Sequence, residues 1–133
     1  MKSINIILIL ISLLIISCSK TNKHNTPDTN AEENNSGEKP KVTFVELGSV
    51  NCIPCKQMQP IMKSVEEKYK GQVKVVFHDV WKDNKPAKQY GIQLIPTQVF
   101  LDENGKEFFR HEGFFPEEEI DKLLASKGLE ITK

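Results

Sequence analysis

Two cysteines separated by two residues, Cys52 and Cys55, are the side chains of this sequence best suited to chemistry. Such a pair can form a short disulfide and exchange it with other thiols, or it can supply two ligands to a metal ion. A bridge that closes so small a loop restricts the unfolded chain very little and would add little stability. The pair is therefore interpreted as a chemical site rather than as a structural crosslink.

A metal site is the main alternative to redox chemistry at this pair. Tetrahedral structural zinc would need two further ligands. The histidines available are His24, His78 and His111, and no two of them form a second closely spaced pair. We expect no metal and no other cofactor. The spacing of Cys52 and Cys55 alone still leaves open a lipid-anchored binding module that holds zinc or copper.

The cysteine pair lies where a strand is expected to give way to a helix. Residues 42–47 are apolar at nearly every position, which is typical of an internal strand. The helix that follows, to about residue 70, carries apolar residues at helical spacing, namely Met58, Ile61, Met62, Val65 and Tyr69. Because a helix N-terminus favours a thiolate, we expect Cys52 to be the nucleophile. Cys55, one turn inside, is expected to be shielded and to resolve the mixed disulfide.

The rest of the folded part reads as a second buried strand, a short helix, a hairpin and a closing helix. These elements are expected at residues 73–80, 85–90, 97–101 with 106–110, and from Pro116, as the first helical residue, to before Gly128. A right-handed crossover would make the first two strands parallel. The order β-α-β-α-β-β-α predicts an α/β fold with a four-stranded mixed sheet flanked by helices.

Glu46 is an acidic residue in a position where apolar side chains are expected. On a period of two it shares a strand face with Val42 and Phe44. Burial would raise the pKa of its carboxyl, which suits a group that exchanges protons near neutral pH. The alternative is a side chain that reaches solvent at the end of the strand. Trp81, the lone tryptophan, lies at the end of the second strand near the rim of the site. It is interpreted as a packing residue, with a surface contact as the alternative.

Several separated features of residues 41–128 resemble the thioredoxin family. The matching features are the run Cys52-Ile53-Pro54-Cys55-Lys56, Pro60 within the active-site helix, the segment Tyr90-Gly91-Ile92-Gln93-Leu94-Ile95-Pro96-Thr97, and Gly113 after the hairpin. The resemblance implies a thioredoxin fold and an enzyme of the thiol-disulfide oxidoreductase class.

The resemblance also assigns roles outside the cysteine pair. It implies that Pro96 is a cis proline, that the backbone of Ile95 pairs with an extended substrate segment, and that Gly113 lines the substrate groove. In the family a buried aspartate, six residues before the first cysteine, relays the proton of the resolving cysteine. Glu46 stands at that position here and is expected to take this catalytic role.

Two departures from the family pattern surround the site. Asn51 stands where a tryptophan usually precedes the first cysteine, and Phe77 replaces a lysine that neighbours the buried acid. Without that positive charge, we expect a higher pKa for Glu46. The same departures mean that the reduction potential need not be that of thioredoxin.

The N-terminal part resembles the export signal of a bacterial lipoprotein. Residues 1–17 contain Lys2 and then an apolar run at residues 4–16 that is too short for a comfortable transmembrane helix. The next residue, Cys18, follows a small residue, as in a lipobox, and is expected to be diacylated. Residues 19–40 are polar and read as a flexible tether, which leaves residues 41–133 as the thioredoxin-like domain.

These features predict a protein of the cell envelope, extracytoplasmic and lipid-anchored to a membrane. We expect protein thiols and disulfides as substrates, a membrane protein as electron donor, reduction as the direction of exchange, and a monomer. An oxidase or isomerase role is the nearest rival. The formal net charge is zero with acids and bases interspersed, so we expect no nucleic-acid partner.

Overall fold

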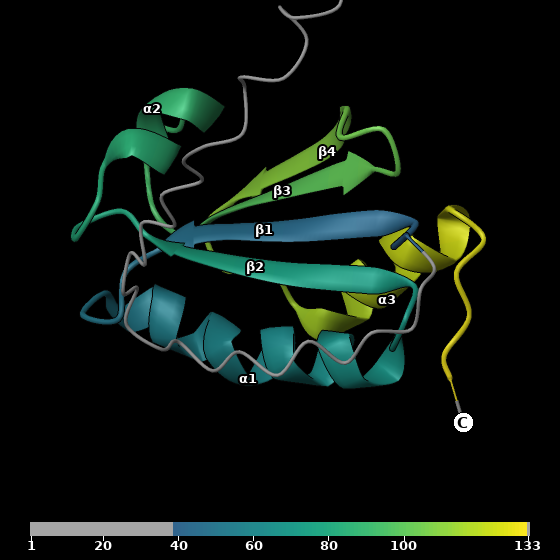
Figure 1. Ribbon diagram of the computed structural model, residues 1–133. Coiled ribbons are helices and arrows are strands. Elements are labelled where there is room, and N and C mark those ends of the chain that lie inside the picture. Colours follow the sequence, from purple (N-terminus) through teal and green to yellow (C-terminus); the bar gives the residue numbers. More distant parts are fainter. Residues whose placement is uncertain (1–38, 133) are drawn as a thin grey trace, which may run out of the picture. The chain divides into compact units, whose positions relative to one another are not determined.

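The computed structural model describes residues 39–132 (Figure 1). The predicted signal peptide, the predicted lipid site at Cys18 and residues 19–38 of the predicted tether lie outside the described residues. Within residues 39–132, no helix has the length and apolar character needed to cross a membrane.

The described residues form four strands and three helices in the predicted order. In chain order they are β1 (Val42–Gly48), α1 (Ile53–Lys68), β2 (Val73–Asp79), α2 (Lys85–Tyr90), β3 (Thr97–Asp102), β4 (Glu107–Glu112) and α3 (Glu117–Ser126). The predicted order β-α-β-α-β-β-α is therefore confirmed. Gly91 caps the C-terminus of helix α2, and its φ of 63° is the left-handed conformation that glycine adopts without strain.

The sheet has the order β2-β1-β3-β4, with β1 parallel to β2 and antiparallel to β3. This confirms the predicted mixed sheet and the crossover through α1. The prediction that the second strand is buried was wrong, because β2 lies at the edge of the sheet and most of its residues are only half-buried. An apolar run does not distinguish an edge strand from a central one when helices cover both faces.

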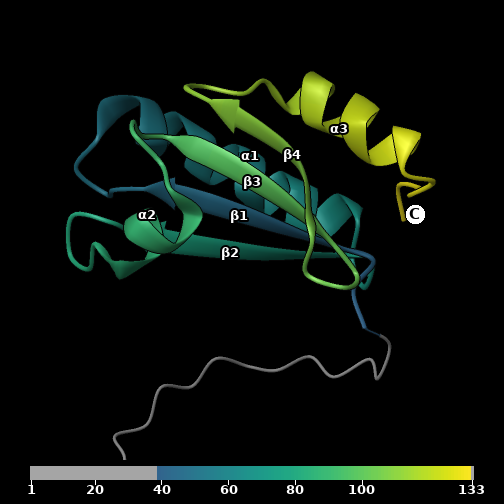
Figure 2. The same cartoon turned by 90° about the horizontal axis from the view of Figure 1, so that it is seen from above.

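Helices cover both faces of the sheet. Helices α1 and α3 lie against one face and α2 lies against the other, as the two ribbon views show (Figures 1 and 2). The larger core, on the α1 and α3 side, centres on the stacked rings of Phe44 and Phe100, with centroids 4.7 Å apart. The smaller core, beneath α2, contains Val45, Leu47 and Val99. The alternating side chains of β1 thus divide between two apolar layers.

Two ion pairs join the last turn of α1 to α3. The ammonium group of Lys68, in the last turn of α1, lies 2.6 Å from a carboxylate oxygen of Glu117 and 2.7 Å from one of Asp121.

Helix α3 begins at Glu117, so the prediction of Pro116 as the first helical residue was wrong by one position. Pro116 has an extended backbone (ψ 142°) and serves as the N-cap.

Candidate active site

The cysteine pair occupies the start of α1, immediately after the carboxyl end of β1. Cys52 is the N-cap residue of α1 and has an extended backbone, while Cys55 lies in the first turn. The two residues form a disulfide with their Cα atoms 5.2 Å apart. The backbone N–H of Cys55 points to the Cys52 sulfur at 3.4 Å. No acidic side chain stands in the first turn, so the positive end of the helix dipole is not neutralised there.

The two cysteines differ slightly in their exposure to solvent. Cys52 is 7% exposed, whereas Cys55 is completely buried, so the expected shielding of Cys55 is present. Gly48 allows Cys55 to pack this closely on β1. A Cβ at position 48 would lie 3.2 Å from both the Cβ and the sulfur of Cys55 and 3.4 Å from the Phe77 ring. The end of β1 is thus shaped around the second cysteine.

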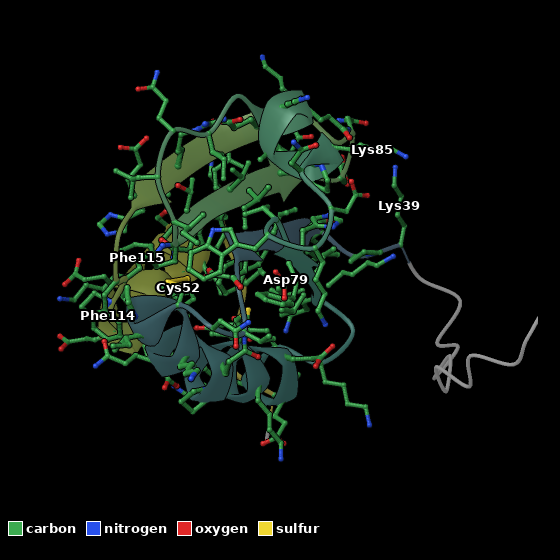
Figure 3. All side chains as sticks on the ribbon, turned by 90° about the vertical axis from the view of Figure 1, so that its left-hand side faces the viewer. Lys39, Cys52, Asp79, Lys85, Phe114 and Phe115 are labelled. Atoms are coloured by element: carbon green, nitrogen blue, oxygen red, sulfur yellow. A yellow bond between two sulfur atoms is a disulfide. The ribbon has the colours of Figure 1, made fainter. Side chains whose placement is uncertain are left out.

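Asp79, at the end of β2, fixes the loop that leads to the cysteines. Its carboxylate accepts hydrogen bonds from the backbone N–H of Val50 at 3.4 Å and from that of Trp81 at 3.2 Å, and the Ser49 hydroxyl also bonds to it. Burial raises the pKa of Asp79, but these bonds outweigh it and hold the pKa below its ordinary value. Figure 3 shows Cys52 between Asp79 on one side and Phe114 and Phe115 on the other.

Glu46 is fully buried on the α1 side of the sheet, as its strand periodicity predicted. Neither of its carboxyl oxygens has a hydrogen-bond partner among the described residues. Burial raises its pKa to about 8, and the neighbouring Gln98 amide opposes part of that rise. The half-buried Phe77 lies opposite Glu46 on β2, where it brings no positive charge. The expected rise in pKa therefore has the expected cause, which is desolvation without a compensating cation.

Gln98 is a second buried polar residue of this site, and the sequence interpretation missed it. It lies directly opposite Glu46 in the β1–β3 register, so both side chains lie on one face of the sheet. Its amide Nε2 donates to the carbonyl of Gly113 at 3.1 Å. The available signal was its place on the same strand face as Phe100, two residues later.

The loop before β3 brings the predicted substrate-binding residues to the same edge of the sheet. The Ile95–Pro96 peptide bond is cis, as predicted. Because Thr97 pairs with Leu47 in the antiparallel register, this loop lies across from the end of β1. The backbone N–H of Gly113 donates to the carbonyl of Pro96 at 2.7 Å. Gly113 has a φ of 92°, which favours glycine.

Large apolar side chains are exposed in the segments around this edge of the sheet. They come from the loops after β1, β2 and β4, the first turn of α1 and the loop before β3, and they are Val50, Ile53, Trp81, Leu94 and Phe114. The prediction that Trp81 packs was wrong, because its side chain is 64% exposed. Asp79 accepts hydrogen bonds from the backbone N–H groups of both Trp81 and Val50, so the exposed tryptophan lies beside the active-site loop.

The described part of the chain contains no group of three or more histidine, cysteine, aspartate or glutamate side chains that could hold a metal ion. His78 and His111 lie on β2 and β4, on opposite edges of the sheet from one another. His24 and Cys18 lie outside the described residues. The structure therefore brings Cys52 and Cys55 together without further ligand residues from residues 39–132.

Comparisons with known proteins agree with this geometry. Residues 27–127 match the family model described as a thioredoxin-like domain. Thioredoxin of Bacillus subtilis strain 168 is 30% identical over 83 residues, which cover 62% of this chain and 79% of the relative. Thioredoxin of Alicyclobacillus acidocaldarius is 29% identical over 98 residues, or 74% and 90% of the two chains. The fold is similar to a mutant thioredoxin from Halobacterium salinarum NRC-1, with a TM-score of 0.61, 22% identity and coverage of 71% and 80%.

Proposed function

The chain belongs to the thioredoxin-like family and is a thiol-disulfide oxidoreductase, and from this premise we propose that it is a membrane-anchored reductant of extracytoplasmic protein disulfides. The observation that carries the proposal is the placement of the Cys52–Cys55 disulfide at the start of α1, with Cys52 7% exposed and Cys55 fully buried. A thiol released at Cys52 meets the positive end of the helix dipole, which favours the nucleophilic thiolate.

The exchange proceeds in two steps. In the reduced protein, the Cys52 thiolate attacks one sulfur of a substrate disulfide, and the other substrate sulfur leaves as a thiolate that takes up a proton. Cys55 then gives up its proton and attacks the Cys52 sulfur, which forms the Cys52–Cys55 disulfide and releases the substrate's second thiolate. Two electrons pass from the protein to the substrate. A donor dithiol must then reduce the disulfide again.

Glu46 is proposed to take the proton that Cys55 gives up in the second step and to return it when the disulfide is reduced. Glu46 and Gly48 lie on the same face of β1, and Gly48 adjoins Cys55. A pKa of about 8 allows the carboxyl to accept or donate a proton near neutral pH. Burial keeps bulk water from taking over that transfer.

The substrates are proposed to be protein segments, held in an extended conformation at Ile95, Pro96 and Gly113. The exposed apolar side chains in the surrounding segments support this substrate class, because such side chains pack well against a polypeptide. Trp81 and Ile53 offer the largest exposed fractions among them, 64% and 76%.

Replacing Trp81 by alanine is expected to lower kcat/KM for a protein disulfide about tenfold, the size of a moderate aromatic contact at an interface. The rate with a small aromatic disulfide should change little, because such a substrate reacts at the Cys52 sulfur without extending to Trp81. The matched control is Ile131→Ala. Ile131 is exposed and lies in the C-terminal segment near Lys68, at the opposite end of α1 from the cysteines, so its replacement should leave both rates unchanged. Equal rates for Trp81→Ala and the parent chain on the protein substrate would refute the contact.

Anchoring is proposed to depend on Cys18, with the polar residues 19–40 as a tether to the domain. Two acyl chains give stable attachment to a bilayer, since each buried methylene contributes about 0.8 kcal/mol. Replacing Cys18 by alanine is expected to abolish labelling with radioactive palmitate and to remove the mature protein from the membrane fraction. Ser19→Ala should behave like the parent chain. Full labelling of the Cys18→Ala variant would contradict the anchor.

The reducing direction can be tested in intact cells that produce the chain. The similarity to thioredoxins supports this direction. Alkylation of free thiols before lysis is expected to find most of the Cys52–Cys55 pair reduced, and depletion of membrane electron carriers should leave it oxidised. A pair that stays disulfide-bonded during growth and delivers its disulfide to reduced substrates would instead establish an oxidase.

A further inference from the structure

Two polar side chains, Glu46 and Gln98, lie fully buried side by side in the sheet. Three of their polar atoms lack a hydrogen-bond partner among residues 39–132, namely both carboxyl oxygens of Glu46 and Oε1 of Gln98. A buried polar atom without a partner is costly, and most proteins keep few of them. A pair of such residues next to the redox site therefore calls for a functional reason.

The Gln98 amide is fixed at one end and free at the other. Its Nε2 donates to the carbonyl of Gly113 at 3.1 Å, and the N–H of Gly113 in turn donates to the carbonyl of Pro96 at 2.7 Å. This leaves one hydrogen on Nε2 and the whole of Oε1 uncommitted. In the antiparallel register the residue directly opposite is Glu46, so the uncommitted part of the amide and the carboxyl share one buried space.

An amide suits a neighbour that changes its protonation state. The second Nε2 hydrogen can be donated to the ionised carboxylate, and Oε1 can accept from the protonated carboxyl. An apolar side chain of the same size offers neither. We propose that Gln98 is a positioning residue of the redox site, whose amide serves both states of Glu46 while its bond to Gly113 ties the carboxyl to the substrate groove. This inference rests on the proposed proton-transfer role of Glu46.

The charged and titratable groups around Glu46 and Gln98 do not replace the Gln98 amide as a hydrogen-bond partner of the Glu46 carboxyl. On the same sheet face, β2 contributes Asp79, which is occupied by the active-site loop, and β4 contributes His111, which lies opposite Gln98 and stacks on Phe115 with centroids 4.3 Å apart. The far end of this face carries Asp102. The start of α1 contributes Cys55, with Cys52 as its N-cap. Gln98 opposes the effect of burial on the pKa of Glu46, which agrees with donation to the ionised carboxylate.

The test replaces Gln98 by methionine, which keeps the length of the side chain and removes its donor and acceptor. In the full chain with the disulfide formed, the carboxyl carbon of Glu46 is followed by NMR between pH 5 and pH 11. The midpoint is expected to rise by about one pH unit, because the ionised form loses a donor. The rate of exchange with a protein disulfide should shift to higher pH by a similar amount. Gln89→Met, an exposed glutamine on α2, is the control and should change neither curve.

Gln98→Leu provides a second apolar replacement if the methionine variant does not fold. A Glu46 midpoint that stays at the parent value in a folded variant would overturn the role of Gln98. A midpoint that rises while the pH profile of exchange stays fixed would support the link between Gln98 and Glu46. That same outcome would refute proton transfer by Glu46, so the two hypotheses fail on different measurements.

Discussion

Replacing Cys52 by serine is expected to lower the rate of disulfide exchange on the order of 10³-fold or more. A hydroxyl cannot form the mixed disulfide, and the buried Cys55 cannot reach a protein substrate in its place. The measurement is the initial rate at which the full chain, supplied with a dithiol donor, reduces insulin disulfides.

The third cysteine of the chain provides the control for this prediction. Cys18→Ala removes a thiol outside the pair, and in the same detergent solution it should keep the parent rate. A Cys52→Ser variant that retains more than a small fraction of the parent rate would contradict the assignment of Cys52 as the attacking residue.

Replacing Glu46 by glutamine is expected to remove a large pH dependence of stability. The pKa of this carboxyl is about 8 in the folded protein, compared with 4.5 for an ordinary glutamate, so between these values the folded state binds more protons than the unfolded state. Stability from this group is therefore complete below pH 4.5, falls as the pH rises, and is lost above about pH 8. The expected loss between pH 5 and pH 8 is roughly 3 to 4 kcal/mol in the free energy of unfolding.

Urea denaturation with the disulfide intact measures this effect at pH 5, 6.5 and 8. The parent chain should lose stability across the series, while Glu46→Gln should lose much less. Glu67→Gln serves as the control, because the Glu67 side chain is exposed on α1 and its removal should leave the parent trend unchanged. Parallel trends for the parent chain and Glu46→Gln would show that Glu46 titrates at its ordinary pKa in the folded protein.

The same substitution should slow exchange, because the second step loses its proton acceptor. A positioned acid or base contributes about 10² to 10⁴-fold in many enzymes. The loss should appear in closure of the Cys52–Cys55 disulfide and not in the first attack by Cys52. Rapid-quench alkylation separates the two steps, since a slow second step allows the mixed disulfide to accumulate.

Much of the fold could be predicted because local patterns dominate it. The strand of residues 42–47, the helical spacing that begins after Cys52 and the glycine after α2 each depend on neighbouring residues, and the structure has all three. The exposure of β2 could not be predicted in this way. Its position at the sheet edge depends on which strands pair, and pairing is set by the whole chain.

The features of the candidate site that depend on local sequence patterns could be predicted, and those that depend on distant segments could not. Burial of Glu46 follows from the two-residue period of β1, and the placement of Cys52 at the helix start follows from the helical spacing that begins after it. Gln98 was missed because a lone glutamine within a strand says nothing of what lies across the sheet. The exposure of Trp81 was missed for a similar reason, since the active-site loop beside it is joined to Asp79 by a bond from Val50 that spans 29 residues.

The most direct test of the redox assignment is to replace Cys55 by serine in cells that produce the full chain and to identify what is attached to Cys52. We expect stable mixed disulfides with other proteins, joined through Cys52, released by dithiothreitol and absent when Cys52 is also replaced by serine. Absence of any trapped protein, together with one zinc or copper ion bound per parent chain, would contradict disulfide exchange and would favour a metal-binding module.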